Sequence, residues 1–152
     1  MNYEKEEQYQ LSLRQIESVL EGVDDEIAKM ATISCILKTN HPTYFWSGFY
    51  RVVDQVLMVG PYQGTMGCLR IEFGKGVCGT CALTGEAQIV QDVHQFEGHI
   101  ACDAKSKSEI VVPVRDKTGA LIAVFDVDST EIGSFDELDQ AWLGKIMARF
   151  FG

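Results

Sequence analysis

The apolar residues of this sequence change their spacing twice along the chain. From Tyr3 to about Asn40, and again after Ser134, they recur at helical intervals, whereas shorter runs with the period of β-strands fill the region between. Helices at both ends of a meander-like set of about six strands predict an α+β domain with an antiparallel sheet. The length of 152 residues fits one such domain over residues 1–152.

Two helices are expected before the strands and one after them. The apolar stripe of the first consists of Leu11, Ile16, Val19 and Leu20. Asp24 and Asp25 open the second helix, and "NHP" at 40–42 ends it. Its apolar positions are Ile27, Met30, Ala31, Ile33, Ile36 and Leu37. Ser134 and Glu137 have the spacing of a capping box for the last helix. The apolar positions of that helix are Leu138, Ala141, Trp142, Ile146 and Phe150.

The segments between the helices are rich in β-branched and aromatic residues and are bounded by turn signals. The predicted strands span residues 46–53, 55–62, 68–73, 88–93, 109–116 and 120–128. A short helix over 76–85 interrupts them, and the last two strands form a hairpin around Asp116–Gly119. Residues 94–107 are predicted to form a long loop, and long loops inside a compact domain are often functional.

The charge of the chain limits its partners. It carries 22 acidic residues against 13 basic ones, for a net charge of −9. This balance argues against binding to nucleic acid or to an anionic membrane, and it suits a ligand that carries an amine. No apolar run is long enough to span a membrane, and the N-terminus is too polar for a signal peptide. We therefore expect a cytoplasmic protein whose cysteines are thiols.

Five cysteines point to metal or redox chemistry. Cys35 lies in an apolar helical segment, where a free cysteine behaves as a small buried hydrophobe. Cys78 and Cys81 have the CxxC spacing of a zinc site. The residues available to complete four ligands are Cys68, Cys102, His94 and His99. The zinc hypothesis is weakened by the lack of a second CxxC or HxxxH pair, and a thioredoxin-like motif would need a βαβ context that the strand pattern lacks.

The remaining hypothesis is a pair of redox-active thiols on separate segments that meet in space. Cys102 lies in the long polar loop, which gives a thiol access to solvent. Its neighbours His99, Lys105 and Lys107 are positive candidates that favour a thiolate, whereas Asp103 opposes one. Cys102 is therefore the candidate attacking thiolate, and another cysteine would resolve its oxidised product as a disulfide.

Six motifs spread from about Trp46 to Asp128 carry a resemblance to a known family. They are "WSGFYRV", "VGPYQG", "GKGVCGT", "GHIACD", "SEIVVP" and "FDVDS". Together they resemble the free methionine-(R)-sulfoxide reductases, a branch of the GAF fold, and they imply a GAF-like domain.

The three cysteines that this family uses fall on Cys68, Cys78 and Cys102. The resemblance implies that Cys102 is catalytic, that Cys68 is the resolving cysteine and that Cys78 is an alternative recycling partner. Cys81 departs from the pattern, because the family has a small residue other than cysteine there. Core packing on the short helix would account for Cys81.

The resemblance also implies a substrate pocket with three acids, Glu109, Asp126 and Asp128, and an aromatic wall of Trp46 with Tyr50. Asp126 and Asp128 lie two apart on one strand and so point to one face, and Glu109 begins the neighbouring strand. The strand pattern alone fits solvent-facing acids equally well. In a pocket, crowded carboxylates raise one another's pKa, so that one of them can protonate a sulfoxide oxygen at neutral pH. The same acids suit the ammonium group of a free amino acid.

The implied activity is reduction of free methionine-(R)-sulfoxide, through a sulfenic acid on Cys102 and a disulfide that thioredoxin reduces. No metal or organic cofactor is required. The alternative is a GAF-type sensor that binds a small molecule without reacting. Such sensors are usually joined to an output domain, whereas this chain ends soon after its last predicted helix. The family suggests a homodimer through the terminal helices. His99 either favours the thiolate, binds the substrate carboxylate or packs the loop.

Overall fold

The computed structural model describes residues 3–152, and its elements follow the order expected from the sequence. They are α1 (Tyr3–Val19), α2 (Glu26–Asn40), β1 (Trp46–Val53), β2 (Val56–Gln63), β3 (Arg70–Glu72), α3 (Gly76–Thr84), β4 (Gln88–Val90), the 3-10 helix η1 (Val93–Gln95), β5 (Ser108–Arg115), β6 (Leu121–Ser129) and α4 (Glu137–Phe151). None of the described helices combines the length and the hydropathy needed to cross a lipid bilayer.

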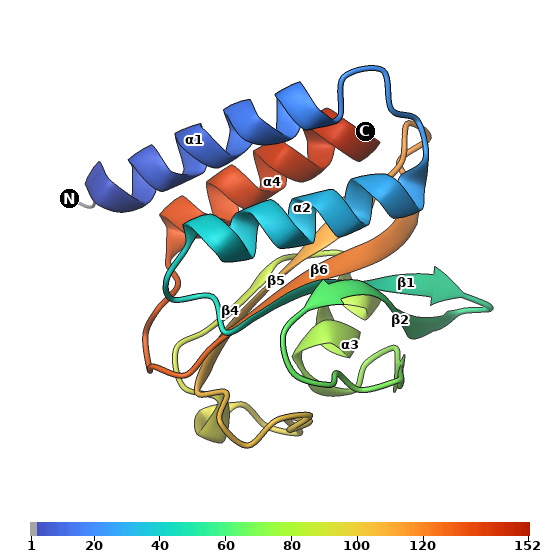
Figure 1. Cartoon of the computed structure of the whole chain (residues 1–152). Helices are drawn as coiled ribbons and strands as arrows, with labels where there is room; N and C mark the ends of the chain where they lie inside the picture. The colour runs from blue at the N-terminus through green and yellow to red at the C-terminus, as the bar shows by residue number, and fades with distance from the viewer. Residues whose placement is uncertain (1–2) are drawn as a thin grey trace.

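The strands confirm the predicted α+β class. Over the described residues, six strands form one antiparallel sheet in the order β3-β2-β1-β6-β5-β4. Helices α2 and α4 pack on one face of this sheet, α1 packs against these two helices, and α3 lies on the opposite face (Figure 1). The middle of the sheet is therefore covered on both sides.

The strands β3 and β4 are shorter than the sequence pattern predicted. Strand β3 pairs with β2 only over Arg70–Glu72, and Cys68, just before it, is joined to Cys102 by a disulfide. Strand β4 ends at Val90, where its pairing with β5 stops, and η1 follows. Both short strands lie at the edges of the sheet, where strand residues have a neighbouring strand on one side only.

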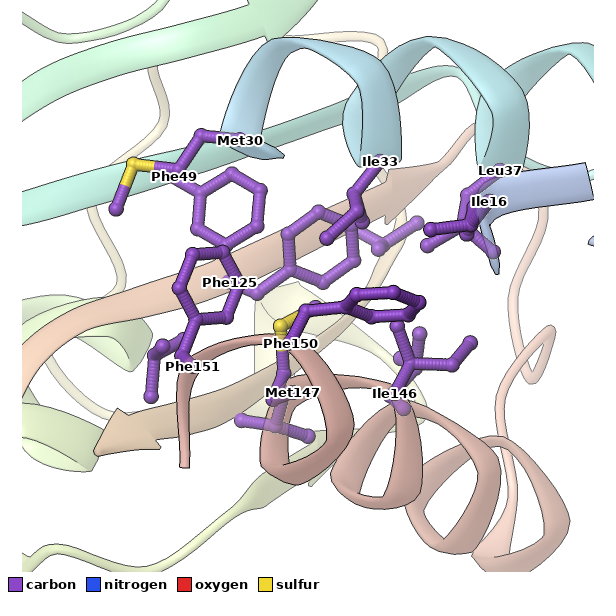
Figure 2. Packing of buried hydrophobic residues seen from close by; sticks show 14 of the residues in the cluster. Ile16, Met30, Ile33, Leu37, Phe49, Phe125, Ile146, Met147, Phe150 and Phe151 are labelled. Carbon is purple, nitrogen blue, oxygen red and sulfur yellow. The ribbon is translucent and has the colours of Figure 1, made fainter. Parts of the chain in front are cut away.

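An apolar core lies between the sheet and the layer of helices α1, α2 and α4. Its side chains on β5 and β6 are alternate residues, namely Ile110, Val112, Val114, Ala123, Phe125 and Val127. Phe125 packs against Phe49 of β1 with ring centroids 4.8 Å apart, between residues of α2 and α4 (Figure 2). Burial of such an aromatic side chain contributes about 1.5–3 kcal/mol to the hydrophobic stabilisation.

The opposite face combines an apolar patch with polar residues. Val77, Cys81 and Ala82 of α3 pack against Val111 and Val124 of the sheet. Helix α3 ends before Gly85, whose φ of 73° is a left-handed conformation that an L side chain rarely adopts. This face, rather than the helical core, holds the candidate functional residues.

The rotation of α1 differs from the predicted stripe. Ile16 and Leu20 are buried as predicted, but Leu11 and Val19 are 40% and 59% exposed, and Tyr9 is fully buried. The Tyr9 hydroxyl donates to Asp139 Oδ1 over 2.6 Å and shares a hydrogen bond of 2.7 Å with the Tyr44 hydroxyl. Long-range polar contacts therefore set the orientation of α1, and the spacing of aliphatic residues alone could not predict it.

The prediction that Cys35 is buried is wrong. Cys35 is exposed on the outer side of α2, and the neighbouring Ser34 is buried with its hydroxyl 3.4 Å from the carbonyl oxygen of Pro61. Ile27 and Ala31 also face outward. The helix thus buries a serine and exposes a cysteine, against the order of their hydropathy, because a backbone acceptor on β2 satisfies the serine.

The predicted capping box of α4 begins two residues too early. Asp136 is the N-cap, and its carboxylate accepts from the backbone N–H of Asp139, whose own carboxylate accepts from the Asp136 N–H. The Ser134 hydroxyl bonds instead to the hydroxyl of Ser129. The buried residues of α4 are Asp139, Leu143, Ile146, Met147, Phe150 and Phe151.

Candidate active site

A row of site residues crosses three neighbouring strands on the α3 face. Asp128 of β6 is the register partner of Trp46 on β1 and of Glu109 on β5. Asp126 lies on the same face two residues earlier, opposite Gly48 and Val111. The alternation of strand residues therefore brings the predicted acids and the tryptophan together.

Two of the three acids are buried rather than solvent-facing. Glu109 is 5% exposed and Asp126 is 4% exposed, while Asp128 is partly buried. The Asp126 Oδ1 atom is buried without a hydrogen-bond partner among the described residues. A buried oxygen without a partner is costly, so this atom is ready to accept a proton or a donor from a ligand.

Burial raises the pKa of all three carboxyl groups well above the usual range for Asp and Glu. Repulsion adds to burial: the charge of Asp128 acts on Glu109, that of Glu109 on Asp126, and that of Asp126 on Asp128. The cluster therefore holds protons at a pH where exposed carboxyl groups are ionised, and it can donate them.

Helix α3 places Cys78 above this cluster. Its Sγ donates to Glu109 Oε2 over 3.9 Å, and the residue is 4% exposed. Burial raises the pKa of the Cys78 thiol well above its usual value, and the nearby Asp126 raises it further. Cys81, on the same helix, is fully buried with a pKa raised by burial to about 12, in the core position expected of it.

The aromatic wall consists of stacked rings on β1 and β2. The Trp46 ring lies 5.7 Å from that of Tyr50 and 5.0 Å from that of Tyr62. Trp46 and Tyr50 are 4% and 2% exposed, and burial raises the pKa of Tyr50, so its hydroxyl stays protonated. The rigid rings give the pocket one apolar side.

A disulfide joins Cys68 to Cys102, which lie 34 positions apart in the sequence and have their Cα atoms 5.3 Å apart. Cys102 is exposed and lines the pocket, and Cys68 is partly buried beside it. Two segments that are distant in sequence therefore carry thiols that meet at the mouth of the pocket.

One pocket contains most of the residues predicted to form the site, with Cys68 joined to it through the disulfide. Predicted residues that line it are Trp46, Tyr50, Cys78, Cys102, Glu109, Asp126 and Asp128. Lining residues that the sequence did not single out for the site include Met66, Ile71, Lys75, Ile100 and Ser106. Those residues lie in loops or on the short edge strand, where no periodicity marks the side that faces the pocket.

His99 also lines this pocket and reaches the acid cluster. Its Nε2 lies 3.5 Å from Glu109 Oε1, its side chain is 14% exposed, and burial lowers its pKa. It is therefore a neutral hydrogen-bonding group at neutral pH rather than a fixed positive charge beside Cys102. His94 is turned outward, 69% exposed, and pairs with Asp92 at 2.8 Å.

Within the described chain, the potential metal ligands that lie close together differ from the alternative zinc set, which the sequence itself weakens. Cys78 Sγ and one carboxylate oxygen each of Glu109 and Asp126 lie within 4.8 Å of one another. The alternative CxxC set is not assembled among the described residues, because Cys81 is outside this group and Cys102 is bonded to Cys68.

The sequence and the fold of this chain are similar to those of known proteins. The GAF domain profile matches residues 16–149. GAF domain-containing protein A of Dictyostelium discoideum is 46% identical over 94% of this chain and 90% of its own. Free methionine-R-sulfoxide reductase of Escherichia coli is 40% identical over 90% of this chain and 82% of its own. The structure of free methionine-R-sulfoxide reductase from Neisseria meningitidis in complex with its substrate superposes with a TM-score of 0.87 at 40% identity, over 93% of this chain and 87% of that one.

Proposed function

This chain belongs to the GAF domain family, in the group that includes the free methionine-R-sulfoxide reductases, and we propose that it reduces free methionine-(R)-sulfoxide to methionine. One observation carries the proposal: Cys102 of the Cys68–Cys102 pair lines the same pocket as the carboxyl groups of Glu109, Asp126 and Asp128. A reducing thiol and a proton donor are the two groups that removal of a sulfoxide oxygen needs.

In the first step the Cys102 thiolate attacks the sulfoxide sulfur, and the sulfoxide oxygen takes a proton. Glu109, Asp126 or Asp128 supplies that proton, because burial and mutual repulsion raise the pKa of these carboxyl groups, so that the cluster retains protons more readily than exposed carboxyl groups do. The oxygen is transferred to Cys102, which leaves methionine and a sulfenic acid. The buried thiol of Cys78, as a donor to Glu109, helps to orient that carboxyl group.

In the second step the Cys68 thiol attacks the sulfur of the Cys102 sulfenic acid. A disulfide forms and water leaves, which is the oxidised state that the structure holds. A dithiol reductant, for which we propose thioredoxin, then restores both thiols and becomes a disulfide itself. This cycle uses protein thiols only and suits the cytosol, where thiols are kept reduced.

The acid cluster also supports selection of a free amino acid. The ammonium group of free methionine sulfoxide pairs with a carboxylate of the cluster, whereas a peptide-bound residue has no such charge. Lys75 and His99 line the same pocket and supply groups for the substrate carboxylate. The Trp46 ring offers a surface for the S-methyl group, since contacts between sulfur and aromatic rings are favourable.

A thioredoxin-coupled assay with separated R and S epimers, free and peptide-bound, tests the proposal. We expect turnover with the free R epimer alone. Cys68→Ser should still release about one methionine per chain in a single turnover, and then slow sharply under steady-state conditions because the sulfenic acid lacks its partner. Binding of the R epimer to the reduced protein without release of methionine would instead support the sensor.

The proposal includes a homodimer that forms through the terminal helices. The apolar side chains of Leu11 and Val19, 40% and 59% exposed on α1, support this contact. Sedimentation equilibrium of the protein, and of a variant with Leu11→Glu and Val19→Glu, tests it. A dimer that the variant loses supports the contact, and a monomeric wild-type protein contradicts it.

A further inference from the structure

Besides the disulfide, one side-chain hydrogen bond links the segments that carry Cys68 and Cys102. The Thr65 hydroxyl donates to Asp103 Oδ2 over 2.8 Å. Thr65 lies three residues before Cys68, and Asp103 directly follows Cys102. The contact therefore joins the same two segments as the disulfide, without a covalent bond.

Both partners of this contact are held in place by other bonds. The second oxygen of Asp103 accepts from the Lys105 N–H over 2.8 Å, and the Asp103 carbonyl accepts from the Ser106 N–H over 3.2 Å. On the other side, the Trp46 indole N–H donates to the Thr65 carbonyl over 2.8 Å. Each end of the Thr65–Asp103 bond is thus attached to a local turn or to the buried aromatic wall.

Two glycines near Thr65 allow this segment of the chain to approach the Trp46 ring closely. A Cβ added at Gly67 would lie 2.8 Å from Cζ2 of Trp46 and 3.1 Å from the Tyr50 hydroxyl. A Cβ added at Gly64, where φ is +134°, would lie 2.8 Å from Cδ1 of the same ring. Both separations are too short for real carbon atoms, so the segment that leads to Cys68 needs glycine at both positions.

The position of Asp103 is otherwise unfavourable for the proposed chemistry. A carboxylate next to the nucleophile opposes formation of a thiolate. The hydrogen bonds from the Lys105 N–H and the Thr65 hydroxyl lower the pKa of Asp103, so it is ionised at neutral pH. An ionised acceptor makes a stronger hydrogen bond than a neutral one. The negative charge of Asp103 beside Cys102 therefore strengthens the bond with Thr65.

We propose that the Thr65–Asp103 hydrogen bond is a clamp that keeps the Cys68 and Cys102 segments together when the disulfide is open. Cys68 then stays close to the Cys102 sulfenic acid, and resolution is fast because the two sulfurs react within one restrained structure. Without the clamp, reduction releases the two segments, so re-forming the disulfide must again restrict their motion. Thr65 and Asp103 are positioning residues in this account. The role of the clamp in resolving the sulfenic acid rests on the proposed function.

The disulfide equilibrium tests the clamp without methionine sulfoxide. Wild-type protein, Thr65→Val and Thr65→Ser are equilibrated with reduced and oxidised glutathione, and the Cys68–Cys102 disulfide is quantified by alkylation and mass spectrometry. Thr65→Val keeps the shape of the side chain and removes the hydroxyl. We expect it to lower the equilibrium constant for disulfide formation about three- to tenfold, the range of one hydrogen bond. Thr65→Ser should restore the wild-type value.

Thr118→Val is a matched control, because its hydroxyl donates to Asp116 Oδ1 over 2.6 Å in the β5–β6 turn, away from the cysteines. It should leave the equilibrium constant unchanged. A double-mutant cycle of Thr65→Val with Asp103→Asn should show that the two changes are coupled. Equal constants for Thr65→Val and wild type would overturn the clamp.

A kinetic readout separates the clamp from the proposed function. In a single turnover with the free R epimer, Thr65→Val should release methionine at the wild-type rate, and its sulfenic acid should persist about three to ten times longer under dimedone trapping. A wild-type sulfenic acid lifetime in Thr65→Val would overturn the clamp. If no methionine is released by any variant while the glutathione equilibrium still shifts, the clamp stands and the assigned reaction fails.

Discussion

Neighbouring residues of β5 and β6 are buried on opposite faces of one sheet, in opposite chemical surroundings. Val112 and Phe125 face α2 and α4 among apolar side chains, at 1% and 0% exposure. Glu109 and Asp126 face α3 and the disulfide, at 5% and 4%. Burial stabilises the first pair and raises the pKa of the second pair. One sheet therefore carries the residues that stabilise the fold on one face and the residues proposed for the reaction on the other.

Removal of the nucleophile on the pocket side should have the largest effect. Cys102→Ser should lower steady-state turnover by roughly a thousandfold or more, because a hydroxyl is a far weaker nucleophile at neutral pH. Its free energy of unfolding, measured under reducing conditions, should match that of reduced wild type. Turnover of the R epimer near the wild-type rate would place the attacking thiol elsewhere.

Removal of a ring on the helix side should have the converse effect. Phe125→Ala should lower the free energy of unfolding by about 3–5 kcal/mol through lost burial and a cavity, as measured by urea denaturation. The turnover number per folded chain should stay near that of wild type. Phe125→Leu, with a smaller loss, serves if the alanine variant does not fold. A large fall in turnover per folded chain would show that the two faces are not independent.

A change of one buried acid should separate activity from stability. Asp126→Asn should lower kcat/KM about ten- to a hundredfold, since it removes either a proton donor or an ammonium partner. A rise in KM would assign ammonium binding, and a fall in kcat alone would assign proton donation. Asp139→Asn, the same change on the helix side, should leave activity per folded chain unchanged.

The smallest expected effect is on the pH dependence of stability, with opposite signs on the two faces. The raised pKa of Asp126 means that the folded state holds a proton that the unfolded state has lost. Its contribution is therefore present at low pH and declines as pH rises above the unfolded value near 4. Burial lowers the pKa of His41, under α1, to about 4, so its contribution is present above the unfolded value of 6.5 and is lost as pH falls from 6.5 to 4.

Urea denaturation between pH 4 and 9 measures both slopes. Asp126→Asn should reduce the loss of stability at rising pH, and His41→Gln should reduce the loss at falling pH. Wild-type slopes in both variants would contradict the assigned protonation states.

Local patterns in the sequence predicted much of this arrangement. The strand 46–53 has the predicted bounds, and the alternation of β6 placed Asp126 and Asp128 on one face. These features depend on residues that are close in sequence. The exposure of Cys35, the start of α4 at Asp136 and the Thr65–Asp103 bond depend on which distant group each side chain meets. The spacing of residues in the sequence does not say which distant groups meet, so only the three-dimensional structure shows these three features.

A single-turnover experiment tests the role of the carboxyl-lined pocket most directly. Fully reduced protein is mixed with free methionine-(R)-sulfoxide or with its N-acetyl derivative, and methionine product and the Cys68–Cys102 disulfide are quantified. The account predicts about one methionine and one disulfide per chain from the free compound, and little of either from the N-acetyl compound, which lacks the ammonium group. Efficient reduction of the N-acetyl compound, or no methionine from the free one, would contradict it.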